Sequence, residues 1–272
     1  MSLLWKAIAT VTLFSAVLSL IVFQGVFESA PVDIGSQHYA EVSTFRHILP
    51  VWVRMPFNTI VNIGYIIVGA YWCAMTTLAS ETKLLGDFDV YMFYLFNVMS
   101  GFYGGVQLLR ILTQKHEFAV LDQWCTLPFF AMVLIWSLNL TYGWKPLRSV
   151  GLILLSLASY VFVLWSPIGF EIALAIHIVG AITGAVVCYR KYPNEDSQFY
   201  FVMAMLSCAG FVGLKVFDLE LPKYANIFKY ISGHFLSKIA DILQIHFVDG
   251  YFQSLIIERI IISRRNKTVK TE

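Results

Sequence analysis

The chain has 272 residues, of which 58% are hydrophobic and only 13% are charged, with a net charge of +2. This composition is far more apolar than that of an ordinary soluble domain. The near-neutral charge, without a basic block interleaved with aromatic residues, argues against nucleic-acid binding. Several apolar stretches of roughly 20 residues are each long enough to cross a bilayer as a helix. The sequence therefore predicts an all-α, polytopic transmembrane helix bundle that forms a single integral membrane domain over residues 1–272.

The first expected span covers residues 3–27. A cleaved signal peptide would have a similar composition, so both interpretations stay open. The apolar run from Ala7 to Phe27 exceeds the usual signal core of about 7–15 residues, which favours a retained helix. Residues 28–55 then form the longest polar connection, which we interpret as a solvated loop.

The second span begins at Pro56, a residue that fits the first turn of a helix. Asn58 and Asn62 lie one turn apart on the same face, and an amide inside lipid needs a hydrogen-bonding partner. The two amides are therefore interpreted either as contacts between helices or as support for a functional site.

Ionisable residues mark the third and fourth spans. The third span, at residues 88–112, carries Arg110 near its end, and the fourth carries Asp122 near its start. A carboxylate about one turn into a membrane helix is either paired or functional. Three more spans are expected at residues 146–165, 169–189 and 198–217.

The last span contains the polar stripe of greatest interest. His234, Lys238 and Asp241 are spaced at i, i+4 and i+7, so they share one face of a helix. Ionisable groups on a membrane helix normally face the interior of a bundle, because exposing them to lipid is costly. We therefore predict a buried polar network made of Asn58, Asn62, Arg110, Asp122, His234, Lys238 and Asp241.

Eight spans place both termini on one side of the membrane. More Lys and Arg residues fall on that side, including the basic tail at residues 263–272, and the positive-inside rule therefore places both termini in the cytosol. The same topology puts Arg110, Asp122, His234 and Lys238 at one level of the opposite half of the membrane.

Several motifs resemble those of known membrane families. Nearly the whole chain is similar to the transmembrane protein 187 family, whose members have no established activity; the likeness is carried by His38-Tyr-Ala-Glu41, Met55-Pro-Phe-Asn58, Leu121-Asp122-Gln-Trp124 and Gly233-His-Phe-Leu-Ser-Lys238. More distantly, Asn58-Thr59-x-x-Asn62, Leu121-Asp122 and Gly233-His234 resemble the alkaline ceramidase superfamily, which includes progestin/adiponectin-type receptors. That second resemblance implies one extra span at residues 3–27 before a seven-helix core at residues 56–262.

The ceramidase resemblance also implies a zinc site, from which this sequence departs. Asp122 and His234 stand at ligand positions, but Lys238 replaces the second His of a His-x-x-x-His pattern and Gly104 stands where another His belongs. A catalytic zinc needs about three protein ligands and an open position. We therefore expect no cofactor, vestigial ligand positions at Asp122 and His234, and an ion pair between Lys238 and Asp122, extended to Arg110 and His234, in the space of the metal.

Three functions remain open at this point. The first is a non-catalytic, ceramidase-like membrane scaffold with a degenerate metal site that binds a lipid or a protein partner. The second is a zinc-dependent lipid amide hydrolase, and the third is a transporter, for which the sequence offers no paired interrupted helices. We favour the first, in a secretory-pathway membrane such as the Golgi or the plasma membrane, with the lipid bilayer as its surroundings and no identified protein partner.

Overall fold

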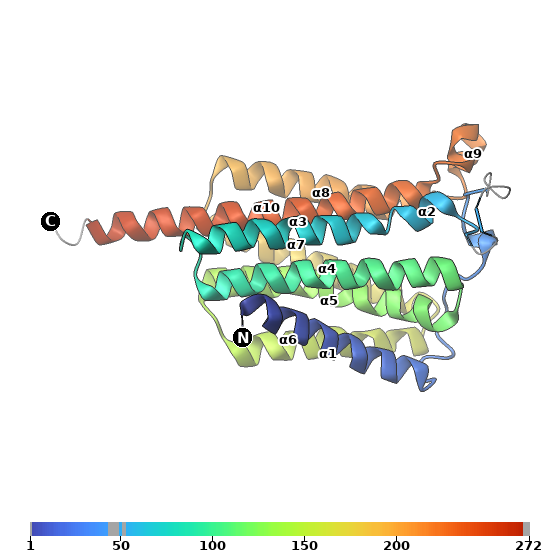
Figure 1. Ribbon diagram of the computed structural model, residues 1–272, viewed down its shortest axis with the longest axis horizontal. Coiled ribbons are helices and arrows are strands. Elements are labelled where there is room, and N and C mark those ends of the chain that lie inside the picture. The colour runs from blue at the N-terminus through green and yellow to red at the C-terminus, as the bar shows by residue number, and fades with distance from the viewer. Residues whose placement is uncertain (1, 43–48, 51–52, 269–272) are drawn as a thin grey trace.

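The computed structural model describes residues 2–42, 49–50 and 53–268, and within these residues all regular secondary structure is helical. The long helices lie roughly side by side and are joined at alternating ends of a bundle (Figure 1). This arrangement confirms the prediction of an all-α helix bundle. Their bounds are α1 Leu3–Phe23, α2 Pro56–Ile60, α3 Ile63–Glu81, α4 Asp87–Thr113, α5 His116–Tyr142, α6 Pro146–Ser159, α7 Gly169–Lys191, α8 Glu195–Val216, α9 Leu221–Tyr224 and α10 Gly233–Thr268.

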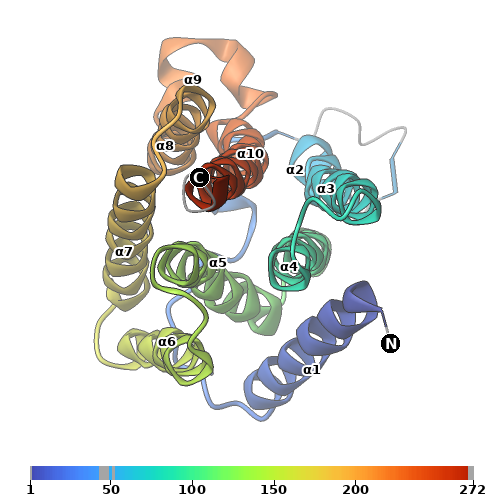
Figure 2. The same ribbon diagram turned by 90° about the vertical axis from the view of Figure 1, so that its left-hand side faces the viewer.

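Six helical segments of the described chain are long and apolar enough to cross a membrane. They are α1, α2 with α3, α5, α6 with the 3-10 turn Tyr160–Leu164, α7 and α8. The helices α4 and α10 carry more polar residues but lie alongside the six in both ribbon views (Figures 1 and 2). The expected number of eight spans counts these two helices and stays a prediction.

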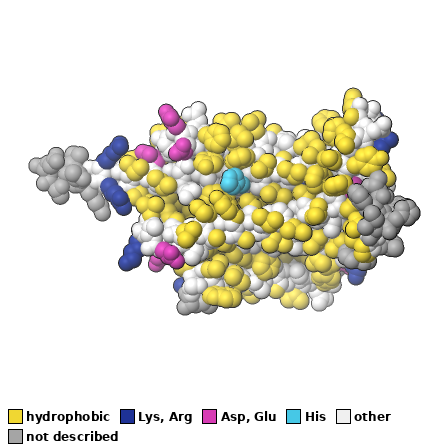
Figure 3. All heavy atoms as spheres, turned by 45° about the horizontal axis from the view of Figure 1, so that its top comes forward, with side chains coloured by type: hydrophobic (Ala, Val, Ile, Leu, Met, Phe, Trp, Pro, Cys, Tyr) yellow, Lys and Arg dark blue, Asp and Glu magenta, His cyan; other side chains and the backbone are white. Residues whose placement is uncertain are grey.

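The face of the molecule shown in Figure 3 has the pattern of a protein that sits in a bilayer. Hydrophobic side chains cover the middle of the face in Figure 3, and the charged side chains gather towards its two ends. A bilayer favours this distribution, because its hydrocarbon core excludes charge and its headgroup regions accept it. Residues 263–268 of the expected basic tail continue α10 as helix, and the remaining four lie outside the described residues.

The helix α5 lies at the centre of the bundle (Figure 2). The inward position is clear from burial: 78% of its most apolar stretch is buried, against 17% for α8 at the edge. Aromatic side chains fill the space around it, and Trp136 of α5 stacks on Phe252 of α10 with ring centroids 4.1 Å apart. Inside a membrane the surrounding lipid is as apolar as the helices, so close packing of this kind supplies much of the stabilisation.

The helices α3 and α4 approach each other closely where glycines meet backbone. A Cβ on Gly69 of α3 would lie 2.5 Å from the carbonyl oxygen of Asn97 in α4, and a Cβ on Gly104 would lie 2.8 Å from the carbonyl oxygen of Asn62. Ser100 of α4 donates a hydrogen bond to the carbonyl of Tyr65 at 2.9 Å across the same contact. Small residues are what allow two membrane helices to reach this separation.

The described part of the connection between α1 and α2 packs against the bundle. Tyr39 and Glu41 are buried, and the amide of Val42 donates to the carbonyl of Lys229 at 2.7 Å. The interpretation of residues 28–55 as a solvated loop is therefore wrong for Tyr39, Ala40 and Glu41, which are buried; Ala40 and Glu41 also hydrogen-bond to Asp218 and to the start of α2. Residues 43–48 and 51–52 lie outside the described residues.

The glycine contact gives a stability prediction with an internal control. The substitution Gly69→Ala should lower the free energy of unfolding by about 1–3 kcal/mol, because the new methyl group forces α3 and α4 apart. Gly101→Ala, on the same helix pair, has no atom within 4 Å of the new Cβ and should leave stability unchanged or slightly raised. Thermal unfolding of both variants in detergent measures the difference, and equal midpoints would show that the close contact is not needed.

Candidate functional site

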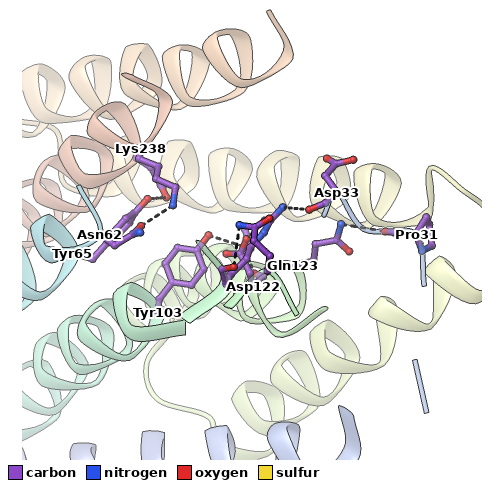
Figure 4. A network of polar contacts seen from close by, with 12 residues as sticks. Pro31, Asp33, Asn62, Tyr65, Tyr103, Asp122, Gln123 and Lys238 are labelled. Atoms are coloured by element: carbon purple, nitrogen blue, oxygen red, sulfur yellow. Dashed lines mark hydrogen bonds and ion pairs between the residues drawn. The ribbon is translucent and has the colours of Figure 1, made fainter. Parts of the chain in front are cut away.

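Polar side chains from five helices meet inside the bundle near the start of α10. They surround a cavity of about 20 Å³, roughly the space of one water molecule. We refer to this space as the polar chamber (Figure 4). Its walls include Tyr65 of α3, Tyr103, Gln107 and Arg110 of α4, Asp122, Gln123 and Thr126 of α5, Lys215 of α8, and His234, Ser237 and Lys238 of α10.

An ion pair between Arg110 and Asp122 forms one wall of the polar chamber. The two residues are only 6% and 7% exposed, and the guanidinium of Arg110 binds Oδ2 of Asp122. The turn between the helices makes this possible: Gln114 adopts a left-handed conformation, with φ at 51°, and its amide caps α4 on the carbonyl of Arg110. Because α5 starts two residues later, Asp122 comes back beside Arg110. The second guanidinium nitrogen donates to the carbonyl of Asp33 at 3.2 Å.

This ion pair corrects the expected charge pairing. Among the residues that the structure describes, the ion-pair partner of Asp122 is Arg110 and not Lys238. The ammonium of Lys238 instead donates to Oδ1 of Asn62 at 2.7 Å (Figure 4). The expected pair fails because Arg110 lies on the antiparallel neighbour of Asp122 and takes up its carboxylate first.

Asn62 is available to Lys238 because the helix is interrupted there. The helix α2 ends at Ile60 and α3 begins at Ile63, and the Nδ2 group of Asn62 donates to the carbonyl of Asn58 at 2.8 Å. The side chain thus satisfies a backbone carbonyl on one side and an ammonium on the other. Of the two interpretations of Asn62, the structure supports a contact between helices that also positions a polar-chamber residue.

The stripe on α10 continues inward from the polar chamber. Asp241 lies one turn beyond Lys238 and accepts a hydrogen bond from the hydroxyl of Tyr65 at 2.7 Å. His234 also lines the polar chamber, and its ring meets that of Tyr39 edge to face with centroids 4.8 Å apart. The structure thus brings His234, Lys238 and Asp241 together along one inward face. Asn58 lies further out, against Glu41 and Ser232.

Two buried carboxylates outside the predicted polar network, Glu41 and Asp218, hold this end of the bundle together. Glu41 accepts hydrogen bonds from the amides of Phe57 and Asn58 at 2.8 and 2.9 Å, and from Nδ2 of Asn58 at 2.7 Å. Asp218 accepts from the amides of Ala40 and His234 at 3.0 and 2.8 Å. Burial raises the pKa of both Glu41 and Asp218 above the usual range, although these donors act to lower it.

Another buried carboxylate outside the predicted polar network, that of Asp249, lies further along α10. Asp249 is fully buried and accepts a hydrogen bond from Nδ2 of Asn97 at 2.8 Å. Further on, Arg259 pairs with Asp89 of α4 at 2.6 Å. The spacing could have indicated Asp249, because it lies two turns beyond Asp241 and so extends the same face.

The polar chamber does not fit a zinc ion. In the described part of the chain, no three His, Cys, Asp or Glu side chains lie close enough together to hold a metal. The carboxylate of Asp122 is already bound to a guanidinium, and zinc needs about three protein ligands. Asp122 and His234 both face the polar chamber, but the residues around them supply cations rather than further ligands.

A separate groove lies on the other side of α4 and α5, bounded by α1 and α6. Its volume is about 250 Å³, and we refer to it as the apolar groove. The side chains along it are mostly aliphatic or aromatic, and Thr10 and Tyr91 contribute hydroxyls that hydrogen-bond to each other at 3.1 Å. The residues around it include Val11, Leu18, Leu95, Met99, Phe102, Val106, Phe129, Met132, Trp144, Ile153 and Leu154.

Comparison with known proteins identifies similar chains but no solved structure. Residues 7–253 match the TMEM187 protein family. Transmembrane protein 187 of Homo sapiens is 39% identical over 242 residues, which is 89% of each chain. Transmembrane protein 187 of Bos taurus is 39% identical over 250 residues, 92% of this chain and 96% of that one. No solved structure matches the chain, and the more distant resemblance to the ceramidases stays a prediction.

The buried ion pair predicts a non-additive pair of substitutions. Arg110→Met and Asp122→Leu should each lower the free energy of unfolding by about 3–5 kcal/mol, because each leaves a charged partner buried alone. Asp122→Leu should cost more, since a carboxyl can take up a proton and an arginine cannot lose one. The double variant should regain most of the loss, because both charges are gone. Unfolding of the four proteins in detergent measures this cycle, and additive losses would contradict it.

Proposed function

Because the chain belongs to the TMEM187 protein family of multi-pass membrane proteins, we propose that it is a non-catalytic lipid-binding protein. It holds one acyl chain of a membrane lipid in the apolar groove. The observation that carries the proposal is the groove itself, which is large, apolar and part of the flank formed by α1 and α6. Both α1 and the segment of α6 with its following 3-10 turn are long and apolar enough to cross a membrane, so lipid tails are the molecules nearest to the opening.

The chemistry of the apolar groove suits an acyl chain. A lipid tail that moves from the bilayer into the groove gains no hydrophobic free energy, because it leaves one apolar medium for another. Its binding depends instead on close contact with side chains such as Leu95, Met99 and Phe129, since each pair of touching atoms contributes dispersion energy. A concave surface provides more of these contacts than the flat outside of a helix.

Polar groups at one end of the groove suggest how a lipid is oriented. Tyr91 lies one turn into α4, and Trp144 and Ser149 lie at the junction of α5 and α6. These positions belong to the end of the bundle where both chain termini lie (Figure 1). Hydroxyl and indole groups favour the headgroup level of a bilayer. In the proposed complex the headgroup therefore lies at this end and the tail runs towards Leu18 and Leu157.

We propose a non-catalytic protein because two cationic side chains of the polar chamber, Arg110 and Lys238, are already bound to other residues. Hydrolysis assisted by a metal needs a water molecule held on a cation with open coordination positions. The Arg110 guanidinium already engages Asp122, and Lys238 is bound to Asn62. These contacts support a structural role for the network. Near-stoichiometric zinc in the purified protein, with release of fatty acid from an amide lipid, would overturn it.

The orientation follows from the same bundle. Both termini lie at one end (Figure 1), and the excess of Lys and Arg expected on that side favours the cytosol. We therefore place both termini in the cytosol of a cell, in a secretory-pathway membrane such as the Golgi. Protease digestion of sealed vesicles should remove an epitope tag from either end when the cytosolic face is outward. Protection of one tag alone would contradict the proposal.

Filling the apolar groove should reduce lipid binding. Leu154 of α6 lies along the groove and is 57% exposed, whereas Ile176 of α7 lies elsewhere on the surface and is 59% exposed. Leu154→Trp should cost about 1–2 kcal/mol of ligand packing, which corresponds to roughly a tenfold loss of affinity. Ile176→Trp adds the same bulk outside the groove and should change little.

A photoactivatable phosphatidylcholine with the reactive group in its acyl chain measures this difference. The full chain is labelled in membranes, purified and digested, and the modified peptides are identified. The proposal expects labels on α1, α4 or α6 in the wild type, and about a tenfold lower yield there in Leu154→Trp. Equal yields in the two tryptophan variants, or labels spread evenly over all lipid-facing helices, would show that the groove holds no lipid.

A further inference from the structure

The polar chamber contains more positive than negative charge. Three basic side chains face it, Arg110, Lys215 and Lys238. Arg110 is balanced by Asp122. Lys238 donates to Asn62, and the carboxylate of Asp241 lies one turn further along α10, so three cations face two carboxylates. Lys215 has neither a hydrogen bond nor an ion pair within the described part of the chain. One positive charge is therefore left without a balancing group.

We propose that the polar chamber binds one small monovalent anion, of the size of chloride, beside Lys215. This site is distinct from the apolar groove and does not depend on the proposed lipid. An anion there would remove the unbalanced charge and accept hydrogen bonds from the ammonium. An isolated ammonium inside a membrane protein is costly, and charges in such places are normally paired.

The surroundings of Lys215 leave this charge only partly compensated. Lys215 occupies the last turn of α8 and is half-buried. A cation gains about 0.3–1 kcal/mol from the dipole at such a helix end, but this interaction does not provide acceptors for its three N–H groups. The nearest further acids, Asp33 and Glu171, are exposed. Water screens them, and the side chain of Asp33 already lies 3.4 Å from His38.

A second unsatisfied donor belongs to Arg110, which also lines the polar chamber. The Nε group of Arg110 is buried and has no acceptor, and Oδ1 of Asp122 is buried and has no donor. A single water molecule would satisfy both of these atoms but would leave the charge of Lys215 unbalanced. An anion accepts hydrogen bonds from ammonium and guanidinium groups together, and such charge-assisted bonds are roughly twice as strong as neutral ones. The combination of a free ammonium and a free guanidinium N–H therefore favours an anion on the Lys215 side.

The size of the polar chamber selects the class of anion. A volume of about 20 Å³ admits one particle close to the size of water. A halide meets this limit, whereas sulfate, phosphate and gluconate contain at least five heavy atoms and do not. A single excess positive charge also matches a monovalent anion rather than a divalent one.

Thermal unfolding in different salts tests the proposal. A ligand that binds only the folded state raises its stability in a saturable manner. The full-length protein in neutral detergent should unfold about 2–4 °C higher in sodium chloride than in sodium gluconate at equal ionic strength. Sodium sulfate at the same ionic strength should not reproduce the rise. An equal rise in sulfate would indicate general exclusion of salt from the protein surface and would overturn the proposal.

Substitutions at two lysines locate the effect. Lys215→Met keeps most of the length of the side chain, removes the charge and should abolish the difference between chloride and gluconate. Lys223→Met is the control, because Lys223 is exposed on α9 and pairs with Glu220 at the surface; it should retain the full difference. If Lys215→Met does not fold, Lys215→Gln is measured in its place. A chloride effect that survives removal of the Lys215 charge, or no effect in the wild type, would overturn the proposal.

Discussion

The ion pair between Arg110 and Asp122 is the interaction on which the polar end of the bundle depends. Both side chains are buried, so each needs the other to offset the cost of removing its charge from water. The short turn after Gln114 is the backbone feature that makes the pairing possible, because it brings the end of α4 and the start of α5 together. With Asp122 occupied in this way, Lys238 has to find another acceptor and takes Asn62. That choice in turn requires the interruption between α2 and α3, where the side chain of Asn62 is free to turn inward.

The carboxylates of Glu41 and Asp218 satisfy buried polar groups in the same way at the end of the bundle. Both come from connections outside the long helices, and both accept backbone amides at the start of α2 or α10. A helix start presents amides without partners, and next to a membrane these groups are costly if they stay unpaired. The connection between α1 and α2 therefore covers the end of the bundle as part of the fold. Its polar composition suggests a solvated loop because the helix ends to which its polar groups bond are distant in the sequence.

The sequence was sufficient for what depends on local pattern. Apolar runs located the helices, and the spacing of His234, Lys238 and Asp241 placed them on one inward face. The sequence was insufficient for predicting contacts between residues that are far apart in the chain. Lys238 and Asn62 are 176 positions apart and Ala40 and Asp218 are 178 apart, and no periodicity within one helix encodes such a choice. The prediction of a Lys238–Asp122 pair failed for this reason: opposite charge and equal depth were known, but the nearer competitor Arg110 was fixed by the geometry of a turn. The apolar groove could not be predicted either, because the side chains that line it come from four different helices and are apolar, as lipid-facing side chains also are.

Tyr103 of α4 lies between the apolar groove and the polar chamber. Its side chain borders the apolar groove and also the polar chamber, and its hydroxyl hydrogen-bonds to Thr126 of α5 at 3.0 Å. An aromatic residue with a polar tip suits this position, since the ring can face lipid-like surroundings while the hydroxyl finds a partner. The ring also meets Tyr65 edge to face, with centroids 5.3 Å apart, and Tyr65 donates to Asp241. A rotation of Tyr103 would therefore change the shape of the apolar groove and the hydrogen bonds around the polar chamber at the same time. Any energetic coupling between ligands in the two spaces would have to act equally in both directions, and Tyr103 is the side chain through which the structure allows it.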